Sequence, residues 1–150
     1  MKHILFLLAV FCCCQIAFSQ ETTFDEALAK SVGADEYGMK KYVFCLLKTG
    51  SNTTASKEET TVAFQGHMAN INRLAKEGKL VVAGPFMANS KNYRGIFVFN
   101  VDTVEAAQAL VDSDPAVKAK LLEADLTVWY ATAALMETLK VHDKIAKTKF

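Results

Sequence analysis

Residues 64–86 read Phe64-Gln-Gly-His67-Met-Ala-Asn-Ile-Asn-Arg-Leu-Ala-Lys-Glu-Gly78-Lys-Leu-Val-Val-Ala-Gly84-Pro85-Phe86. This pattern predicts an amphipathic helix that ends at Gly78, a short buried strand, and a tight turn at Gly84-Pro85. On a helical wheel the apolar side chains share one arc, which contains Phe64, Met68, Ile71, Leu74 and Ala75. His67 lies inside that arc. An ionisable ring on a core-facing surface is a candidate catalytic base, because burial and nearby charges control its protonation. A hydrogen-bonded core histidine is the alternative interpretation.

The first 19 residues have the features of a secretory signal peptide. Lys2 is followed by an apolar run over residues 4–14 and by the small-x-small site Ala17-Phe18-Ser19. We therefore expect cleavage before Gln20 and an exported protein, periplasmic or secreted. The apolar run is shorter than the roughly 20 residues of a spanning helix, so no membrane segment is expected after cleavage. Lipid attachment at the cysteines of residues 12–14 is the alternative, and the bulky Phe11 disfavours it.

Composition and charge limit the partners of the mature chain. Of 150 residues, 51% are hydrophobic and 22% are charged, which is typical of one globular domain. Without residues 1–19 the chain keeps 17 − 1 = 16 basic residues against 16 acidic ones. Such a balance does not favour nucleic acid as a partner. Cys45 is then the one remaining cysteine, expected to be buried, and no histidine or cysteine spacing supports a metal site.

The hydrophobic patterns predict a polar N-terminal arm over residues 20–40 and an α+β domain over residues 41–150. The expected strands are residues 41–48, 79–83, 94–100 and 126–131, and the expected helices are residues 57–77, one begun by an Asp102/Glu105 capping box, and 133–147. Asp114 is expected to cap a short turn over residues 116–122 that begins with Pro115.

This order is that of a ferredoxin-like βαββαβ sandwich with an added C-terminal helix. Its helices would cover one face of an antiparallel sheet. The other face, which carries Phe97, Phe99 or their neighbours, would then be covered by a second copy of the chain. We therefore expect a homodimer.

The ordered set His67, Gly78-Lys-Leu80, Gly84-Pro85, Glu105-Ala-Ala107 and Asp114-Pro115 resembles the YCII-related family. The resemblance implies a dimeric α+β barrel with a small-molecule site, in which His67 and Asp114 face a shared pocket. Some members of the family carry an aspartate at the position that Lys76 occupies here.

Two functions follow from these residues. The first is a cofactor-free enzyme of isomerase or lyase type, in which His67 is the catalytic base and Asp114 orients it. The backbone of Gly84 and Pro85 could shape the floor of the substrate pocket, and Arg94 could anchor an anionic substrate; a simple turn at Gly84-Pro85 and a solvated Arg94 are the alternatives. The second is a non-catalytic module that binds an apolar ligand, for example a haem through His67. A purely structural dimeric role is the third possibility.

Overall fold

The computed structural model describes residues 23–148. The predicted signal peptide, residues 1–19, lies outside the described residues. None of the helices within residues 23–148 is both long and apolar enough to span a membrane.

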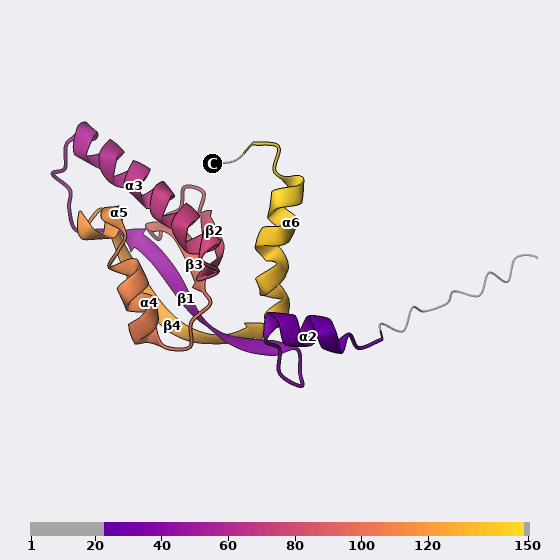
Figure 1. The fold of residues 1–150 in the computed structure, drawn as a ribbon. Helices are drawn as coiled ribbons and strands as arrows, with labels where there is room; N and C mark the ends of the chain where they lie inside the picture. The colour runs from indigo at the N-terminus through magenta and orange to yellow at the C-terminus, as the bar shows by residue number, and fades with distance from the viewer. Residues whose placement is uncertain (1–22, 149–150) are drawn as a thin grey trace, which may run out of the picture.

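The fold is an antiparallel four-stranded sheet with helices on it, as the sequence predicts (Figure 1). The strands are β1 (Met39–Thr49), β2 (Leu80–Pro85), β3 (Tyr93–Phe99) and β4 (Leu122–Thr132), in the order β2-β3-β1-β4. The helices are α2 (Glu26–Val32), α3 (Lys57–Lys76), α4 (Val104–Val111), α5 (Pro115–Lys118), the 3-10 helix η1 (Ala133–Glu137) and α6 (Thr138–Ile145). The ferredoxin-like α+β class is therefore confirmed.

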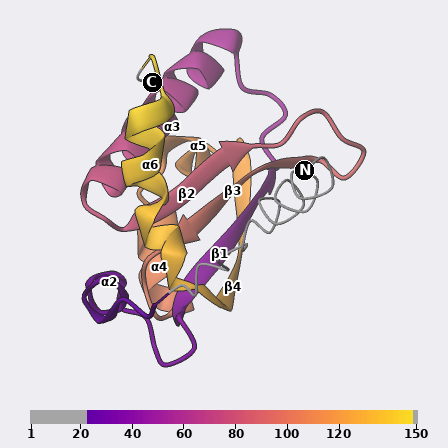
Figure 2. The ribbon, with the colours of Figure 1, turned by 90° about the vertical axis from the view of Figure 1, so that its right-hand side faces the viewer.

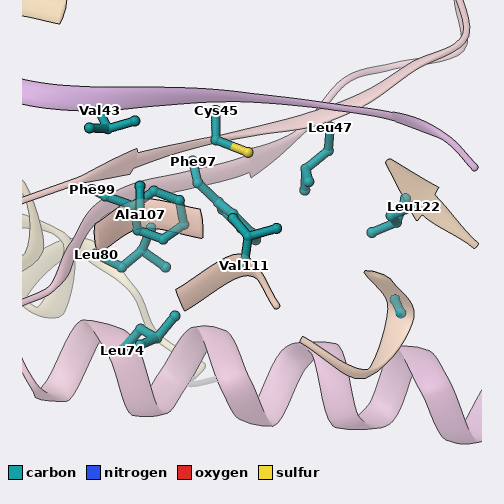
Figure 3. Packing of buried hydrophobic residues seen from close by; sticks show 11 residues of the cluster. Val43, Cys45, Leu47, Leu74, Leu80, Phe97, Phe99, Ala107, Val111 and Leu122 are labelled. Atoms are coloured by element: carbon teal, nitrogen blue, oxygen red, sulfur yellow. The ribbon is translucent and has the colours of Figure 1, made fainter. Parts of the chain in front are cut away.

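One face of the sheet packs against α3 and α4 and holds the main core. Alternate residues of β1, namely Val43, Cys45 and Leu47, point into this layer, because successive side chains of a strand face opposite sides. Phe97 and Phe99 of β3 lie in the same cluster (Figure 3). The sequence analysis predicted that Phe97, Phe99 or their neighbours lie on the opposite face. The neighbours Ile96 and Val98 lie there, since they pair with Leu46 and Phe44 of β1.

The opposite face is partly covered by the chain's own C-terminal segment, which the sequence analysis did not foresee. Leu135 and Met136 of η1 pack on a second cluster of buried residues, made of Tyr42, Val81, Val98 and Ala131. The helix α6 then crosses in front of β2 (Figure 2), where the Thr138 hydroxyl lies 2.6 Å from the carbonyl oxygen of Val81 and 2.6 Å from that of Leu135. Phe44, Leu46, Ile96 and Trp129 of the same face are left partly exposed.

Several boundaries differ from the predicted ones for local reasons. The helix α4 is capped by Thr103 and not by Asp102, since Thr103 Oγ1 accepts from the Ala106 N–H at 3.2 Å. The strand β4 begins at Leu122, four residues before the predicted start, because it pairs with β1 as far as Thr49. The predicted terminal helix is divided into η1 and α6. The predicted capping box at Ser56 and Glu59 is present at the start of α3.

A glycine lets α5 lie directly against α3. A Cβ atom on Gly66 would lie 2.7 Å from Pro115 Cγ and 2.9 Å from Pro115 Cβ, far inside normal contact distance. Gly66 immediately precedes His67, and Pro115 immediately follows Asp114. This close approach therefore brings the two predicted site residues together.

The Gly66→Ala substitution tests this contact. Alanine in a helix interior is normally more stable than glycine. Here we expect the opposite, a loss of about 1–3 kcal/mol in the free energy of unfolding, because the added methyl group overlaps a rigid proline ring. Urea unfolding measures the change, with Gly84→Ala as the control, since a Cβ there meets no atom within 4 Å. A Gly66→Ala protein more stable than the parent would contradict the tight packing.

Candidate active site

The structure places His67 and Asp114 in contact across 47 residues of sequence. His67 lies on the sheet-facing side of α3, and Asp114 is the N-cap of α5. The ring Nδ1 of His67 lies 2.8 Å from Oδ2 of Asp114. His67 is 9% exposed and Asp114 is 0% exposed, so this polar pair lies almost wholly within the protein.

Four N–H groups surround the Asp114 carboxylate. Oδ1 accepts from the backbone N–H groups of Ala116 and Val117, at 2.9 and 3.4 Å. Oδ2 contacts His67 Nδ1 and accepts from Asn70 Nδ2 at 3.2 Å. Burial raises the pKa of Asp114. The hydrogen bond and the charge of His67, together with the hydrogen bonds from Asn70 and Ala116, nevertheless hold this pKa below its ordinary value. Asp114 is therefore a buried carboxylate.

The state of Asp114 fixes the roles of the two nitrogens of His67. An ionised carboxylate only accepts, so Nδ1 must be the donor, and Nε2 of the neutral ring carries the lone pair. Within residues 23–148, the contact with Asp114 is the one hydrogen bond of this ring. Phe97 stacks on the ring with centroids 5.7 Å apart, and Phe64 meets it edge-on at 5.8 Å. Two aromatic rings thus contact an imidazole whose Nε2 can accept a proton.

A second layer of polar groups supports the carboxylate, and the sequence analysis missed it. Asn70 Oδ1 accepts from Arg73 Nη2 at 2.7 Å and lies 3.2 Å from Ser113 Oγ. The available signal was the spacing of His67, Asn70 and Arg73, which puts three polar residues on one face of α3. Without the position of Asp114 nothing in the sequence distinguished them from surface residues.

The other predicted site residues lie apart from this pair. Gly84 and Pro85 are the last residues of β2, at the edge of the sheet, and Arg94 is an exposed residue near the start of β3. Within the described part of the chain, no hydrogen bond, ion pair or ring contact joins any of them to His67 or Asp114. Their role in substrate binding stays a prediction.

Two further features bear on the chemistry. Burial, with the charges of Asp125 and Asp114, raises the pKa of the Cys45 thiol to about 12, so Cys45 is a neutral core side chain. Among the residues that the structure describes, no three His, Cys, Asp or Glu side chains cluster closely enough to hold a metal ion.

A cavity of about 280 Å³ lies between α4, α5 and β4, and neither His67 nor Asp114 lines it. Its apolar lining includes Val111, Val117 and Leu122, and its polar lining includes Gln108 and Lys120. The cavity is thus separate from the buried pair.

Comparison with known proteins identifies one matching family. No curated protein matches the chain. Among solved structures, a 5-chloro-2-hydroxyhydroquinone dehydrochlorinase from Burkholderia phenoliruptrix AC1100, in complex with 2,5-dihydroxybenzoquinone, is 17% identical with a TM-score of 0.44. That match covers 58% of this chain and 92% of the other. The model of the YCII-related domain matches residues 42–129, which include β1 from Tyr42 on, all of β2 and β3, β4 up to Trp129 and both residues of the buried pair. Because this match extends over more than half of the sequence, the chain belongs to the YCII-related family.

Proposed function

We propose that this YCII-related protein is a small-molecule enzyme in which His67 transfers a proton and Asp114 orients it. The observation that carries the proposal is the 2.8 Å contact between a buried imidazole and a buried carboxylate. Burying such a pair is costly unless its partners are fully arranged, and here they are. The proposal assigns the proton transfer to side chains of this chain alone.

The chemistry that fits is removal of a proton from carbon. Nε2 of His67 takes the proton, and the electron pair of the broken C–H bond moves into a new double bond. In an elimination, a leaving group on the neighbouring carbon departs with its own electron pair. In an isomerisation, the imidazolium returns the proton to a different carbon. In both reactions Asp114 stabilises the imidazolium while it exists.

The aromatic rings around His67 favour a substrate with a planar or apolar body. Phe97 stacks on one face of the imidazole and Phe64 contacts its edge. Such walls exclude water from most of the ring and strengthen the interaction of the imidazolium with Asp114. We further propose that the enzyme is exported, on the strength of the signal pattern in residues 1–19.

We also propose that two copies pair through the partly uncovered face of the sheet. The support is the apolar character of this face beyond η1 and α6, where Phe44 and Trp129 pack edge-on with centroids 6.1 Å apart. Trp129 is 41% exposed although it lies on a sheet face lined by apolar side chains. Exposed apolar surface of this kind is typical of an interface.

Sedimentation tests the pairing. We expect the mature protein to be a dimer at micromolar concentration, and Trp129→Glu to convert it to a monomer, because a charge would be buried between the two faces. Val128→Glu is the matched control: Val128 is the neighbouring residue of β4, faces the other side of the sheet, and is similarly exposed at 48%. A monomeric parent protein, or equal effects of both substitutions, would contradict the pairing.

Deuterium exchange tests the proton transfer. The mature protein is incubated in D2O with a panel of small carbonyl compounds that carry acidic C–H bonds, and NMR follows the loss of each proton signal. For the compounds that the protein exchanges, we expect His67→Gln to slow the exchange by about 10²–10⁴-fold, the usual contribution of a positioned base. The control is His142→Gln, at the exposed histidine of α6.

Exchange that survives in His67→Gln would contradict the proposal. An absorbance band that appears on adding haem and is missing in His67→Gln would instead support the ligand-binding alternative.

Acid unfolding tests the ionised state of Asp114. A carboxyl group whose pKa is lowered on folding stabilises the protein above its unfolded pKa, near the ordinary value of 3.8, and this stabilisation is lost as the pH falls through the folded pKa. We expect Asp114→Asn to lower the free energy of unfolding by about 1–3 kcal/mol near neutral pH. The difference from the parent protein should shrink below about pH 4. Urea unfolding across this pH range measures it, and a constant difference would contradict an ionised Asp114.

A further inference from the structure

We infer that Asn70 is a positioning residue, which shares the Asp114 carboxylate with His67 and acts through it on the protonation of the ring. This inference rests on the proposed function, because it concerns the same pair. Asn70 Nδ2 donates at 3.2 Å to Oδ2, the oxygen that also accepts from His67 Nδ1. Asn70 is 7% exposed, so its amide lies buried beside the pair. A buried amide on a core-facing helix surface is tolerated only where its hydrogen bonds are made.

The orientation of the Asn70 amide is fixed from its other end. Oδ1 accepts from Arg73 Nη2 at 2.7 Å. Ser113 Oγ also lies 3.2 Å from Oδ1, but its proton is closer to the Leu110 carbonyl at 2.6 Å, so Arg73 is the main donor. A flipped amide would set its NH2 group against these donors and its oxygen against a carboxylate oxygen. The network therefore allows a single orientation, with the donor facing Asp114.

Arg73 is itself held in place from the surface. Its Nη1 donates to Glu77 Oε1 at 2.8 Å, one helical turn further along α3, and its side chain is about half exposed. A continuous chain of hydrogen bonds thus runs from this surface ion pair through Asn70 and Asp114 to His67. Arg73, Asn70 and Asp114 are each hydrogen-bonded to a neighbour on both sides.

The second donor on Oδ2 has a chemical consequence. The backbone N–H groups of Ala116 and Val117 hold Oδ1 in place, so the carboxylate stays against His67 while Asn70 shares its Oδ2. The negative charge of Oδ2 is also shared between the amide and the imidazole, which weakens the pull of Asp114 on a positively charged ring. Asn70 thereby takes part of the hydrogen-bonding capacity of the oxygen that faces the ring.

Nitrogen NMR of the histidine rings tests this role without a substrate. The pH titration of His67 is followed in the mature parent protein and in Asn70→Leu, which has similar volume but no donor. We expect the titration midpoint of His67 to rise by about half a pH unit in Asn70→Leu, because the carboxylate then acts on the ring alone. Gln65→Leu makes a comparable amide-to-isobutyl change at an exposed position of α3 and should leave the midpoint unchanged.

Arg73→Lys keeps the inference testable if Asn70→Leu does not fold. Lysine retains the positive charge but not the planar fork that holds Oδ1, so the amide can turn away from Asp114. We expect a smaller rise of the midpoint in the same direction. A purely structural role of Asn70 would lower stability and leave the midpoint where it was.

Asp114→Asn separates failure of this inference from failure of the proposed function. In the same titration we expect it to lower the midpoint of His67, since the stabilising negative charge is gone. If Asp114→Asn leaves the midpoint unchanged, the pair itself is wrong, and both the proposed function and the role of Asn70 fall. If Asp114→Asn lowers the midpoint of His67 but Asn70→Leu leaves it unchanged or lowers it, only the role of Asn70 is overturned. Arg73→Lys is read in the same way if Asn70→Leu does not fold.

Discussion

The arrangement of the helical layer depends on the solvation of one buried carboxylate. Asp114 has no contact with water, so every stabilising interaction of its charge must come from the protein. Two N–H groups come from the first turn of α5, and the others come from His67 and Asn70 on α3. Moving α5 away from α3 would leave a charge buried without partners. The pair of helices is therefore fixed by electrostatics as well as by apolar packing.

Steric fit and electrostatics act together at this contact. Gly66 removes the side chain that would hold α5 away from α3, and Pro115 fills the space. On the sheet side, Phe97 provides a flat surface under the His67 ring. The position of the imidazole is thus set by a rigid strand below, a helix backbone behind and a carboxylate at its Nδ1. Such restraint is what a proton-transferring group requires to hold one orientation.

Local patterns predicted the fold and singled out His67, whereas the pairing of His67 with Asp114 was predicted from the resemblance to the YCII-related family. His67 stood out on an apolar arc, and Asp114 before Pro115 is a capping pattern that the structure confirms. Asn70 could not be recognised, because its importance depends on a residue 44 positions away. The choice between Asp102 and Thr103 as the cap of α4 was also open, since both residue types cap helices well.

Other differences arose from tertiary pairing and from a local signal that the prediction left out. The early start of β4 follows from its pairing with the whole length of β1, and the alternation of apolar and charged side chains from Leu122 to Asp125 was the signal for it. Both alternating sets of β3 are apolar, so periodicity alone could not decide which set faces the helices. The coverage of the second face by η1 depends on where the chain turns after β4. No feature of residues 133–147 alone specifies that turn.

The contact between α6 and β2 has a consequence for aggregation. A strand at the edge of a sheet offers its free backbone groups to strands of other chains, which is a common start of disordered association. Here the Thr138 hydroxyl of α6 lies against the Val81 carbonyl, and Pro85 has no N–H group to donate. An incoming strand would therefore meet α6 near Val81 and no donor at Pro85, and both features discourage chain-to-chain growth at this edge.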